Sequence, residues 1–437
     1  MLDEKFVSST CGPALSNSTA IAKDVGIWTQ VLSPSYSVTG AFKKSSAPVN
    51  CVAVSDTHIY AAQHEKAYVH VYSRQRGNQE AFVAFPDRIR CLTLAGHVLV
   101  AGTAEGRLML WETTTGRLVS TPPRHVQAVS SMVATPYHII SGSDDSDIHV
   151  WSLAQLLDLD AGEDHEPERS LPNHRAAITS LVASQDSNPD TSICVSASKD
   201  KSCIIWNYRS GDVLRSLLFP SFPLCVALDP ASRALFSSCE DGSLYLVEFF
   251  AEKPLLGASA EDASTVVQVS SPFGVTPTDA GPASCLAVSY DGTQLLTGHP
   301  KGQILKWDVA DNKTPVEVAN LNAAVTNIVF LSPFPEVKHI VAPTIVKPNQ
   351  AERNYTLTAQ FSSDLGPQSK FDTLLKTPGF SLNVLEDAIA ALQQPVAESG
   401  REQELAKENE ELWEVINEQR ALQKQALQLQ LSKSARP

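Results

Sequence analysis

The sequence predicts an all-β fold: a closed ring of seven four-stranded blades, followed by a C-terminal α-helical, coiled-coil extension. Three observations carry this prediction. Five of the six tryptophans each end a short strand-like run, at intervals close to multiples of about 40 residues, the length of one propeller blade. Strand-like runs separated by turns fill these intervals. Near the C-terminus, a long stretch has no glycine or proline.

Seven positions mark successive blades. The tryptophans supply five of them, and the ends of the runs AYVHVY and SLYLV supply the other two. In chain order, the markers are Trp28, Tyr72, Trp111, Trp151, Trp206, Val247 and Trp307.

The stretch that ends at Trp151 illustrates one blade. AVSSMVA and HIISGS have the apolar and β-branched content of strands, DDSD forms a tight turn, and IHVW is a third strand. The runs ITSLVAS, SICVSAS, KDKS and CIIW repeat this order up to Trp206. Short strands of this kind indicate blades rather than βαβ units.

The first blade is expected to close the ring. Before Ala47 the chain holds only three strand-like runs, FVSSTC, TAIAKDVGIW and SVTGAF. We expect the missing strand from AVTNIVFL, residues 324–331, because pairing N-terminal strands with a C-terminal strand removes the free edges. The propeller is then expected to span residues 1–345.

Two blades carry the same set of polar and aromatic residues. The sets are His125, Ser141, Asp145 and Trp151 in one blade, and His174, Ser196, Asp200 and Trp206 in the next. A hydrolase triad also uses Ser, His and Asp. Recurrence beside a tryptophan instead favours a buried structural network that satisfies the indole N–H. The pattern resembles the His–Ser–Asp–Trp network of the WD40 family.

The other blades depart from this pattern. Glu105 and Lys301 stand where the aspartate would precede Trp111 and Trp307. Tyr72 and Val247 replace the tryptophan itself. We therefore expect apolar packing alone to hold these blades.

Composition excludes several classes of function. The net charge of −14 argues against broad, phosphate-driven binding of nucleic acid. The sequence has no apolar run long enough for a transmembrane helix, and MLDEKFVSST does not read as a secretory signal. The eight cysteines form no CxxC pair and are expected to be buried and reduced, as in a cytosolic or nuclear protein. We expect no metal site, no cofactor and no catalytic constellation.

Two segments interrupt the repeat. Residues 154–173 begin with helix formers and are strongly acidic, which indicates either a solvated loop or a docking surface for a basic partner. Residues 250–281 are rich in Ala, Ser, Thr and Pro and are expected to form a flexible insertion.

The C-terminal part is expected to be helical. Residues 346–400 read as an extended linker with a short helix over 381–394, and residues 401–432 as a coiled-coil helix. The candidate partner-binding residues of this helix are Leu405, Asn409, Leu412, Trp413, Ile416 and Leu422. A narrow apolar stripe on a terminal helix favours contact with another chain, either a second copy or a different protein, over packing on the propeller's own face.

The whole arrangement resembles one family more closely. The acidic insertion, the ring begun by N-terminal strands and the tail ELAKENEELWEVINEQRALQKQAL are together similar to the WD-repeat subunit of the Rix-type complex, which matures precursors of the large ribosomal subunit. The resemblance implies a nuclear, non-enzymatic assembly factor in pre-rRNA internal-spacer processing. The implied partners are a helical-repeat scaffold subunit, the pre-ribosomal particle and, through the complex, an AAA-type remodelling ATPase.

Two alternatives remain at this stage. A substrate receptor of a ubiquitin ligase would need a helical adaptor-docking segment, which the first 20 residues do not show. An enzyme that used the central channel would need carboxylates or metal ligands on the inner strands, where runs such as CVAV and CLTL are apolar.

Overall fold

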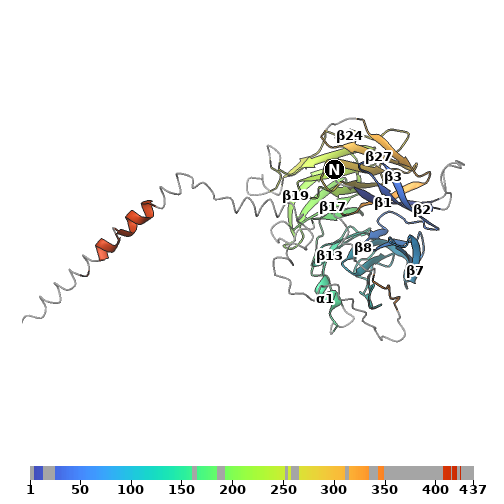
Figure 1. Ribbon diagram of the computed structural model, residues 1–437, viewed down its shortest axis with the longest axis horizontal. Helices are drawn as coiled ribbons and strands as arrows, with labels where there is room; N and C mark the ends of the chain where they lie inside the picture. The colour runs from blue at the N-terminus through green and yellow to red at the C-terminus, as the bar shows by residue number, and fades with distance from the viewer. Residues whose placement is uncertain are drawn as a thin grey trace, which may run out of the picture. The chain divides into compact units, whose positions relative to one another are not determined.

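The protein is described by a computed structural model. It describes residues 4–12, 25–159, 165–184, 192–250, 254–256, 265–310, 314–333 and 343–348, and, in the C-terminal part, residues 407–414, 416–420 and 424. The chain divides into two units, Met1–Phe361 and Ser362–Pro437. Every described strand belongs to the first unit (Figure 1).

The first unit is a seven-bladed β-propeller, as the sequence predicts. The first blade contains β29 (Ala324–Phe330), β1 (Lys5–Cys11), β2 (Val25–Val31) and β3 (Ser37–Lys43). The second contains β4 (Val52–Val54), β5 (His58–Ala62), β6 (Tyr68–Ser73) and β7 (Asn78–Ala84). The third contains β8 (Ile89–Ala95), β9 (Val98–Thr103), β10 (Leu108–Glu112) and β11 (Leu118–Ser120).

The fourth and fifth blades follow in chain order. The fourth blade contains β12 (Val129–Ala134), β13 (His138–Ser143), β14 (Ile148–Ser152) and β15 (Arg169–Ser170). The fifth contains β16 (Ile178–Ala183), β17 (Ile193–Ser198), β18 (Ser202–Asn207) and β19 (Asp212–Leu218), with β23 (Val266–Gln268) as a fifth strand.

The sixth and seventh blades complete the ring. They contain β20 (Pro223–Leu228), β21 (Ala234–Cys239), β22 (Ser243–Glu248) and β24 (Gly274–Val275); and β25 (Cys285–Val288), β26 (Gln294–Gly298), β27 (Gln303–Asp308) and β28 (Val316–Asn320). In Figure 1 the blue N-terminal strands lie beside the orange strands of the seventh blade.

Strand β29 closes the ring by pairing antiparallel with β1. Phe6 lies opposite Phe330, and the pairing continues to Cys11 opposite Ala324. The side chain of Asn327 adds hydrogen bonds to Ser9 Oγ at 2.9 Å and to the Pro48 carbonyl at 2.7 Å. The closing strand therefore ties the N-terminal strands to the connection that leads into the second blade.

The core lies between neighbouring blades. The second strands β9 and β17 are buried along their whole length because each face packs against an adjacent blade. Strands that are buried on both faces have nearly continuous apolar sequences, in which apolar and polar residues do not alternate. Tryptophans fill the space between blades: Trp111, which is fully buried, meets the Tyr60 ring edge-on with centroids 6.2 Å apart.

Glycine allows the first strand of the next blade to approach closely. A Cβ atom added at Gly102 would lie 2.5 Å from Cys91 Sγ and 2.8 Å from Val129 Cγ1. At Gly142 it would lie 2.8 Å from Ile178 Cγ2. Contacts this short leave no room for a side chain in the tight packing of a protein core.

The segment 250–281, expected to be a flexible insertion, carries ordered strands. β23 pairs in parallel with β19, Ser216 opposite Val266, and β24 pairs with β22. Two buried stretches of its described part also pack on the blades, at Leu256 and Ala280. Its residues 251–253 and 257–264 lie outside the described part of the chain.

Helices are few. α1 (Leu153–Leu157) follows β14 directly, and residues 407–414 and 416–420 are helical in the second unit. Within the described residues, no helix has the length and apolar character needed to cross a membrane. The short helix expected over 381–394 and the linker over 349–400 lie outside the described residues.

Candidate functional site

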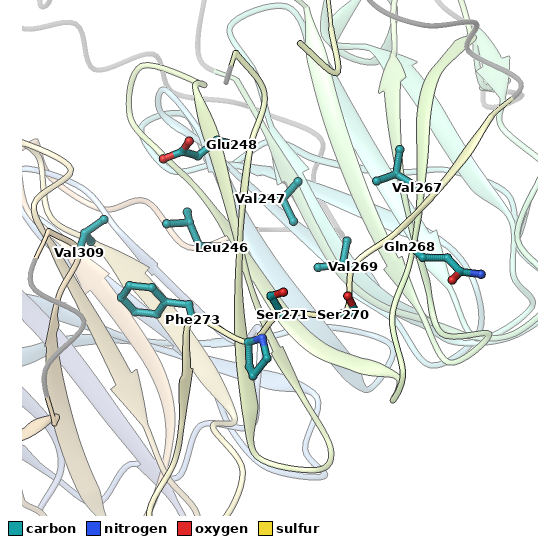
Figure 2. Close-up of a pocket in the computed structure, with 11 residues that line it drawn as sticks. Leu246, Val247, Glu248, Val267, Gln268, Val269, Ser270, Ser271, Phe273 and Val309 are labelled. Carbon is teal, nitrogen blue, oxygen red and sulfur yellow. The ribbon is translucent and has the colours of Figure 1, made fainter. Parts of the chain in front are cut away.

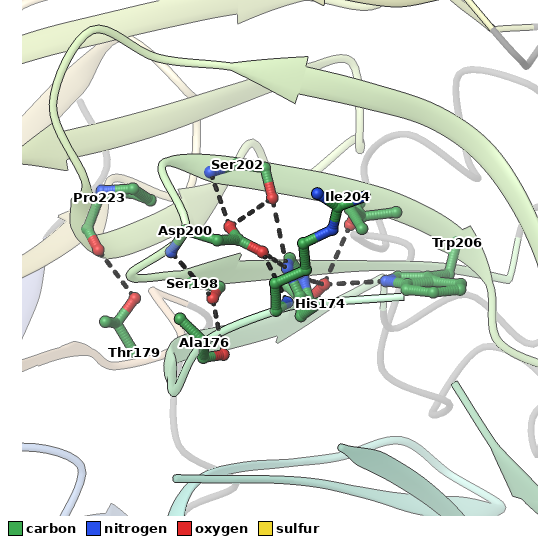
Figure 3. A network of polar contacts seen from close by, with 11 residues as sticks. His174, Ala176, Thr179, Ser198, Asp200, Ser202, Ile204, Trp206 and Pro223 are labelled. Atoms are coloured by element: carbon green, nitrogen blue, oxygen red, sulfur yellow. Dashed lines mark hydrogen bonds and ion pairs between the residues drawn. The ribbon is translucent and has the colours of Figure 1, made fainter. Parts of the chain in front are cut away.

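A buried polar network links two strands of the fifth blade, the turn between them and the loop before β16 (Figure 3). Trp206 Nε1 donates to Ser196 Oγ at 2.8 Å, and His174 Nε2 lies 2.7 Å from the same oxygen. On the other side of the ring, His174 Nδ1 donates to Asp200 Oδ2 at 3.0 Å. The structure thus brings together all four residues that the sequence singled out in this blade.

The Asp200 carboxylate organises the turn between β17 and β18. Besides His174, it accepts hydrogen bonds from the Arg175 amide at 3.0 Å and from Ser202, whose amide and hydroxyl lie at 2.9 and 2.6 Å. Burial by itself would raise the pKa of Asp200, but the bonds from His174, Ser202 and Arg175 outweigh it and hold that pKa well below its usual range. The carboxylate stays ionised and binds the turn to the loop before β16.

The fourth blade has the same arrangement with one looser contact. Trp151 Nε1 donates to Ser141 Oγ at 2.9 Å, and His125 Nε2 lies 2.9 Å from that oxygen. Asp145 accepts from the amides of Val126 and Asp147 at 2.8 and 2.9 Å, but its oxygen is 3.4 Å from His125 Nδ1. Burial raises the pKa of Asp145, yet the His125 ring and the two amides bring it well below its usual range.

These networks have the character of architecture rather than of an active site. Ser141 and Ser196 are fully buried, and His125 and His174 are 3% and 5% exposed. A serine nucleophile has to reach a substrate carbonyl. Here each hydroxyl instead serves the indole N–H and the imidazole of its own blade, and of the ring nitrogens in the two networks only His125 Nδ1 lacks a hydrogen bond among the described residues.

The seventh blade corrects the expectation of apolar packing alone. Trp307 Nε1 donates to Thr297 Oγ1 at 3.1 Å, and that hydroxyl lies 2.8 Å from His299 Nε2. His299 Nδ1 donates to the Gly281 carbonyl at 2.9 Å. Threonine takes the place of serine, and the histidine follows the second strand directly. The run LLTGH contains both residues, but a pattern that requires an aspartate before the tryptophan does not include them.

The third blade also departs from the expectation of apolar packing alone. Trp111 Nε1 donates to the Val346 carbonyl at 3.0 Å, and the Val346 amide donates to the Thr113 carbonyl at 2.9 Å. Gly116, at a φ of +78°, makes room for this segment, because a Cβ there would lie 2.8 Å from Val346 Cγ1. The chain after the last strand therefore returns to cover this blade with residues 343–348.

The two markers without tryptophan differ from each other. The Tyr72 hydroxyl lies 3.0 Å from His70 Nδ1, and the Tyr72 ring packs on Phe42 with centroids 5.0 Å apart. Val247 packs in the apolar cluster that includes Leu217 and Phe219. Four markers belong to blades that depart from the His–Ser–Asp–Trp pattern: Tyr72, Trp111, Val247 and Trp307. Of these, only Val247 is held by apolar contacts alone.

The acidic insertion folds partly onto the propeller. Arg117 of the third blade donates to the carbonyls of Leu157 and Asp158, at 2.7 and 2.8 Å, at the end of α1. Glu166 pairs with Arg124 at 3.1 Å, and Glu168 lies 3.4 Å from His138. Of these contacts, the Arg124–Glu166 ion pair neutralises one acidic charge within the chain. Residues 160–164 lie outside the described part.

No metal site is found among the described residues, where histidines, cysteines and carboxylates do not gather in groups of three. The cysteines are free thiols, and all except the half-buried Cys11 are buried. Burial raises the pKa of Cys51, Cys194, Cys239 and Cys285 to about 12. These four thiols are therefore neutral core groups rather than metal ligands or nucleophiles.

The C-terminal helix exposes the predicted stripe. Asn409 is exposed, Leu412 and Trp413 are each 57% exposed, and Ile416 is 41% exposed. Three such side chains within five residues of one helix form a contiguous exposed apolar surface, the kind of feature that marks interaction sites. Leu405 and Leu422, the outer members of the predicted stripe, lie outside the described residues.

We expect acid to destabilise the propeller in two stages. Burial lowers the pKa of His149 and His299 below the ordinary 6.5, so the unfolded chain binds these protons first and stability falls as the pH drops below about 6.5. The pKa values of Asp145 and Asp200 are lowered from the ordinary 3.8. The stability that these two carboxylates add is present above pH 3.8 and is lost as the pH falls further.

Urea unfolding at a series of pH values measures both stages. The Asp200→Asn variant serves as the control, because it should lose less stability than the unaltered chain below about pH 4 while keeping the upper stage. An unfolding free energy that stayed constant between about pH 8 and 5 would contradict the assignment of neutral, buried imidazoles.

Comparison with known proteins agrees with this geometry. The family model described as "WD domain, G-beta repeat" matches residues 116–152 and 165–207, which lie in the third to fifth blades. A chain of a mitotic checkpoint complex crystal structure superposes with a TM-score of 0.53 at 17% identity, covering 66% of this chain and 86% of the other. That likeness shows the fold alone.

Relatives in sequence are similar over more than half of this chain. Pre-rRNA-processing protein IPI3 of Yarrowia lipolytica is 27% identical over 62% of this chain and 64% of its own length. WD repeat-containing protein 18 is 30% identical in Danio rerio, over 63% of this chain and 62% of the relative. The human protein of that name is 28% identical over 70% of this chain and 69% of its own length.

The chain thus covers less than two thirds of the length of the first two relatives. The chain is thus a seven-bladed β-propeller that carries WD40 repeats over residues 116–152 and 165–207 and is similar to the WD-repeat pre-rRNA-processing proteins.

Proposed function

We propose that this protein is a non-catalytic scaffold that acts in pre-rRNA internal-spacer processing, during maturation of the large ribosomal subunit. The observation that carries the proposal is the similarity to a protein named for pre-rRNA processing, together with a propeller whose recurrent Ser, His and Asp side chains serve its own core. On this proposal the protein acts in the nucleus, as one subunit of a larger complex.

The tail helix is the proposed assembly element. Leu412, Trp413 and Ile416 present apolar surface to solvent, and Asn409 lies one helical turn before Leu412. A polar residue within an apolar stripe selects register and the number of partners in coiled coils. Extended by Leu405 and Leu422, this stripe would bind a second copy of the chain or the helical-repeat subunit of the complex.

Charge along the tail supports an orientation. Residues 401–418 hold seven glutamates against Arg401 and Lys407, whereas residues 419–437 hold four basic residues and no acid. Two such helices match best when they run antiparallel, acidic half against basic half. Exposed ion pairs contribute only about 0.2–1 kcal/mol each, so the charges set orientation while the apolar stripe supplies the affinity.

Removing residues 401–437 is expected to leave the propeller folded and to abolish self-association or partner binding. No described strand is lost, so thermal unfolding of the propeller should not change. Light scattering of the purified chain, with and without the tail, measures self-association, and co-purification measures partner binding.

Leu412→Asp should reproduce the loss of association, because it places a charge in the stripe. Glu411→Ala, a change at the neighbouring exposed position, should keep the association intact and serves as the matched control. If neither deletion nor Leu412→Asp alters mass or partners, the tail is not an assembly element.

Affinity purification of the tagged full chain from nuclear extract, followed by mass spectrometry and RNA analysis, tests the cellular role. We expect precursor proteins of the large subunit, unprocessed spacer RNA, a helical-repeat subunit and an AAA-type ATPase. Depletion of the protein should cause spacer-containing pre-rRNA to accumulate. Recovery of cullin and adaptor subunits, without ribosomal precursors, would instead support a ubiquitin-ligase receptor.

A further inference from the structure

The sixth blade lacks most of its outermost strand. β24 pairs with β22 only at Ser243 and Leu244. In the fifth blade, by comparison, β19 has seven residues and pairs with β18 along the whole of that strand. The outer edge of β22 from Leu246 to Glu248 is therefore left without the strand that the ring geometry would place beside it.

The direction of the backbone groups on this edge follows from two hydrogen bonds. The Phe249 amide donates to the Arg233 carbonyl, so odd-numbered residues of β22 face β21. The Phe273 amide donates to the Leu244 carbonyl, so even-numbered residues face outward. The N–H and C=O groups of Leu246 and Glu248 thus point outward, and no described residue binds them. Unpaired edges of this kind are templates for another extended chain.

A groove runs along this edge. A cavity of about 600 Å³ is lined by Leu246–Glu248 and by the chain from Val267 to Phe273, and a neighbouring one of about 400 Å³ shares Leu246, Glu248 and Val309 with it. Figure 2 shows Phe273 and Val309 on one side of the β22 edge and Val267 and Val269 on the other. Each wall therefore offers apolar side chains, while Glu248, Gln268, Ser270 and Ser271 add polar groups to the lining.

The path of the chain explains the gap. β23 pairs in parallel with β19 of the fifth blade instead of with β22. Residues 269–273 then cross back to the sixth blade, where the short β24 follows. The space beside Leu246–Glu248, which a longer fourth strand would occupy, remains open between β22 and this crossing segment.

We propose that the groove binds an extended segment of a partner protein, which adds to β22 as an antiparallel strand and completes the sixth blade. Its backbone would pair with Leu246 and Glu248. Alternate side chains would meet Phe273 and Val309 on one wall and Val267 and Val269 on the other, so the segment is apolar at successive positions.

The charge of the groove adds one further requirement. Glu248 is exposed and has no ion-pair partner among the described residues, whereas the nearby Arg233 is held by Asp229 at 3.0 Å. A lysine or arginine at the end of the bound segment would pair with Glu248. This proposal is independent of the role in pre-rRNA processing, since it follows from the backbone of one blade.

The same propeller covers other blades with extended segments of its own chain. β23 lies on β19 as an added edge strand, and Val346 of the strap over residues 343–348 exchanges hydrogen bonds with the Thr113 carbonyl and the Trp111 indole of the third blade. The pairing of β23 shows that an extended segment suits such an edge. At β22 the described residues supply none, which is why we assign the occupant to a partner.

Short random peptides displayed on phage and selected on the full-length chain provide the probe. We expect enrichment of apolar peptides with a flanking basic residue. Glu248→Pro should weaken their binding roughly five- to ten-fold, because proline removes an outward N–H and leaves the ladder to β21 intact. Glu248→Gln keeps that N–H and should cost less, within about five-fold.

Hydrogen exchange on the unaltered chain gives a second readout that needs no variant. The amides of Leu246 and Glu248 should exchange rapidly in the free chain and slowly once a selected peptide is bound. The proposal is overturned if no such peptide is enriched, or if the selected peptides bind the Glu248→Pro chain equally well. It is also overturned if both amides are already protected in the free chain, which would mean that a segment of this chain occupies the edge.

Discussion

A chain that ends at residue 323 is expected to lose the folded propeller, whereas one that ends at residue 361 should keep it. The shorter chain lacks β29, so β1 loses the strand that pairs with it from Phe6 to Cys11. It also loses the bonds from Asn327 to Ser9 and Pro48, and the Thr326 hydroxyl bond to the Ala47 carbonyl at 2.7 Å. An open ring exposes two strand edges and the apolar surface between the first and seventh blades.

Circular dichroism, thermal unfolding and size-exclusion chromatography measure this effect. We expect aggregation or a lost cooperative transition for the shorter chain, and an intact transition for the longer one. A soluble shorter chain that unfolds at the same temperature as the longer one would show that β29 does not close the ring.

The second large effect is expected for Asp200→Ala. The change removes the acceptor for the buried His174, for the Arg175 amide and for both donors of Ser202, at a half-buried turn. Leaving buried donors without a partner costs about 1–3 kcal/mol. Asp145→Ala should lie lower in this range, because Asp145 accepts from two amides and its His125 contact is long.

Asp241→Ala is the matched control. Asp241 lies at the same place in the sixth blade, six residues before Val247, but among the described residues its carboxylate accepts only from the Ser243 amide, at an exposed turn. We expect its unfolding free energy in urea to change by less than about 1 kcal/mol. Equal losses for Asp200→Ala and Asp241→Ala would mean that the His174 network contributes nothing to stability.

Much of the fold could be predicted because a propeller repeats itself. Each blade needs a bulky residue at the end of its third strand and turns at regular intervals, and these local requirements recur along the sequence from Trp28 to Trp307. The sets around Trp151 and Trp206 were visible for the same reason. Their donors and acceptors all lie within one blade, at similar spacings in both.

The less regular blades could be predicted only in part. Thr297 and His299 satisfy Trp307 from positions that do not match the other two networks, so a search for the repeated pattern passed over them. The flexible insertion expected over 250–281 rested on composition, yet β23 within it finds an edge to pair with. Composition reports the average preference of a segment, and a free neighbouring edge overrides that preference.

The sequence by itself determined the number of blades, the strand that closes the ring and the buried network of the fourth and fifth blades. Each of these follows from spacings within about 40 residues, or from a count of strands. Only the tertiary structure decided that Val346 accepts from Trp111 and that β22 keeps an open edge. The Val346 bond and the open β22 edge depend on where residues 343–348 and 269–273 lie in the folded chain. No periodic pattern in the sequence encodes these positions, because any backbone carbonyl or amide can serve as a hydrogen-bond partner.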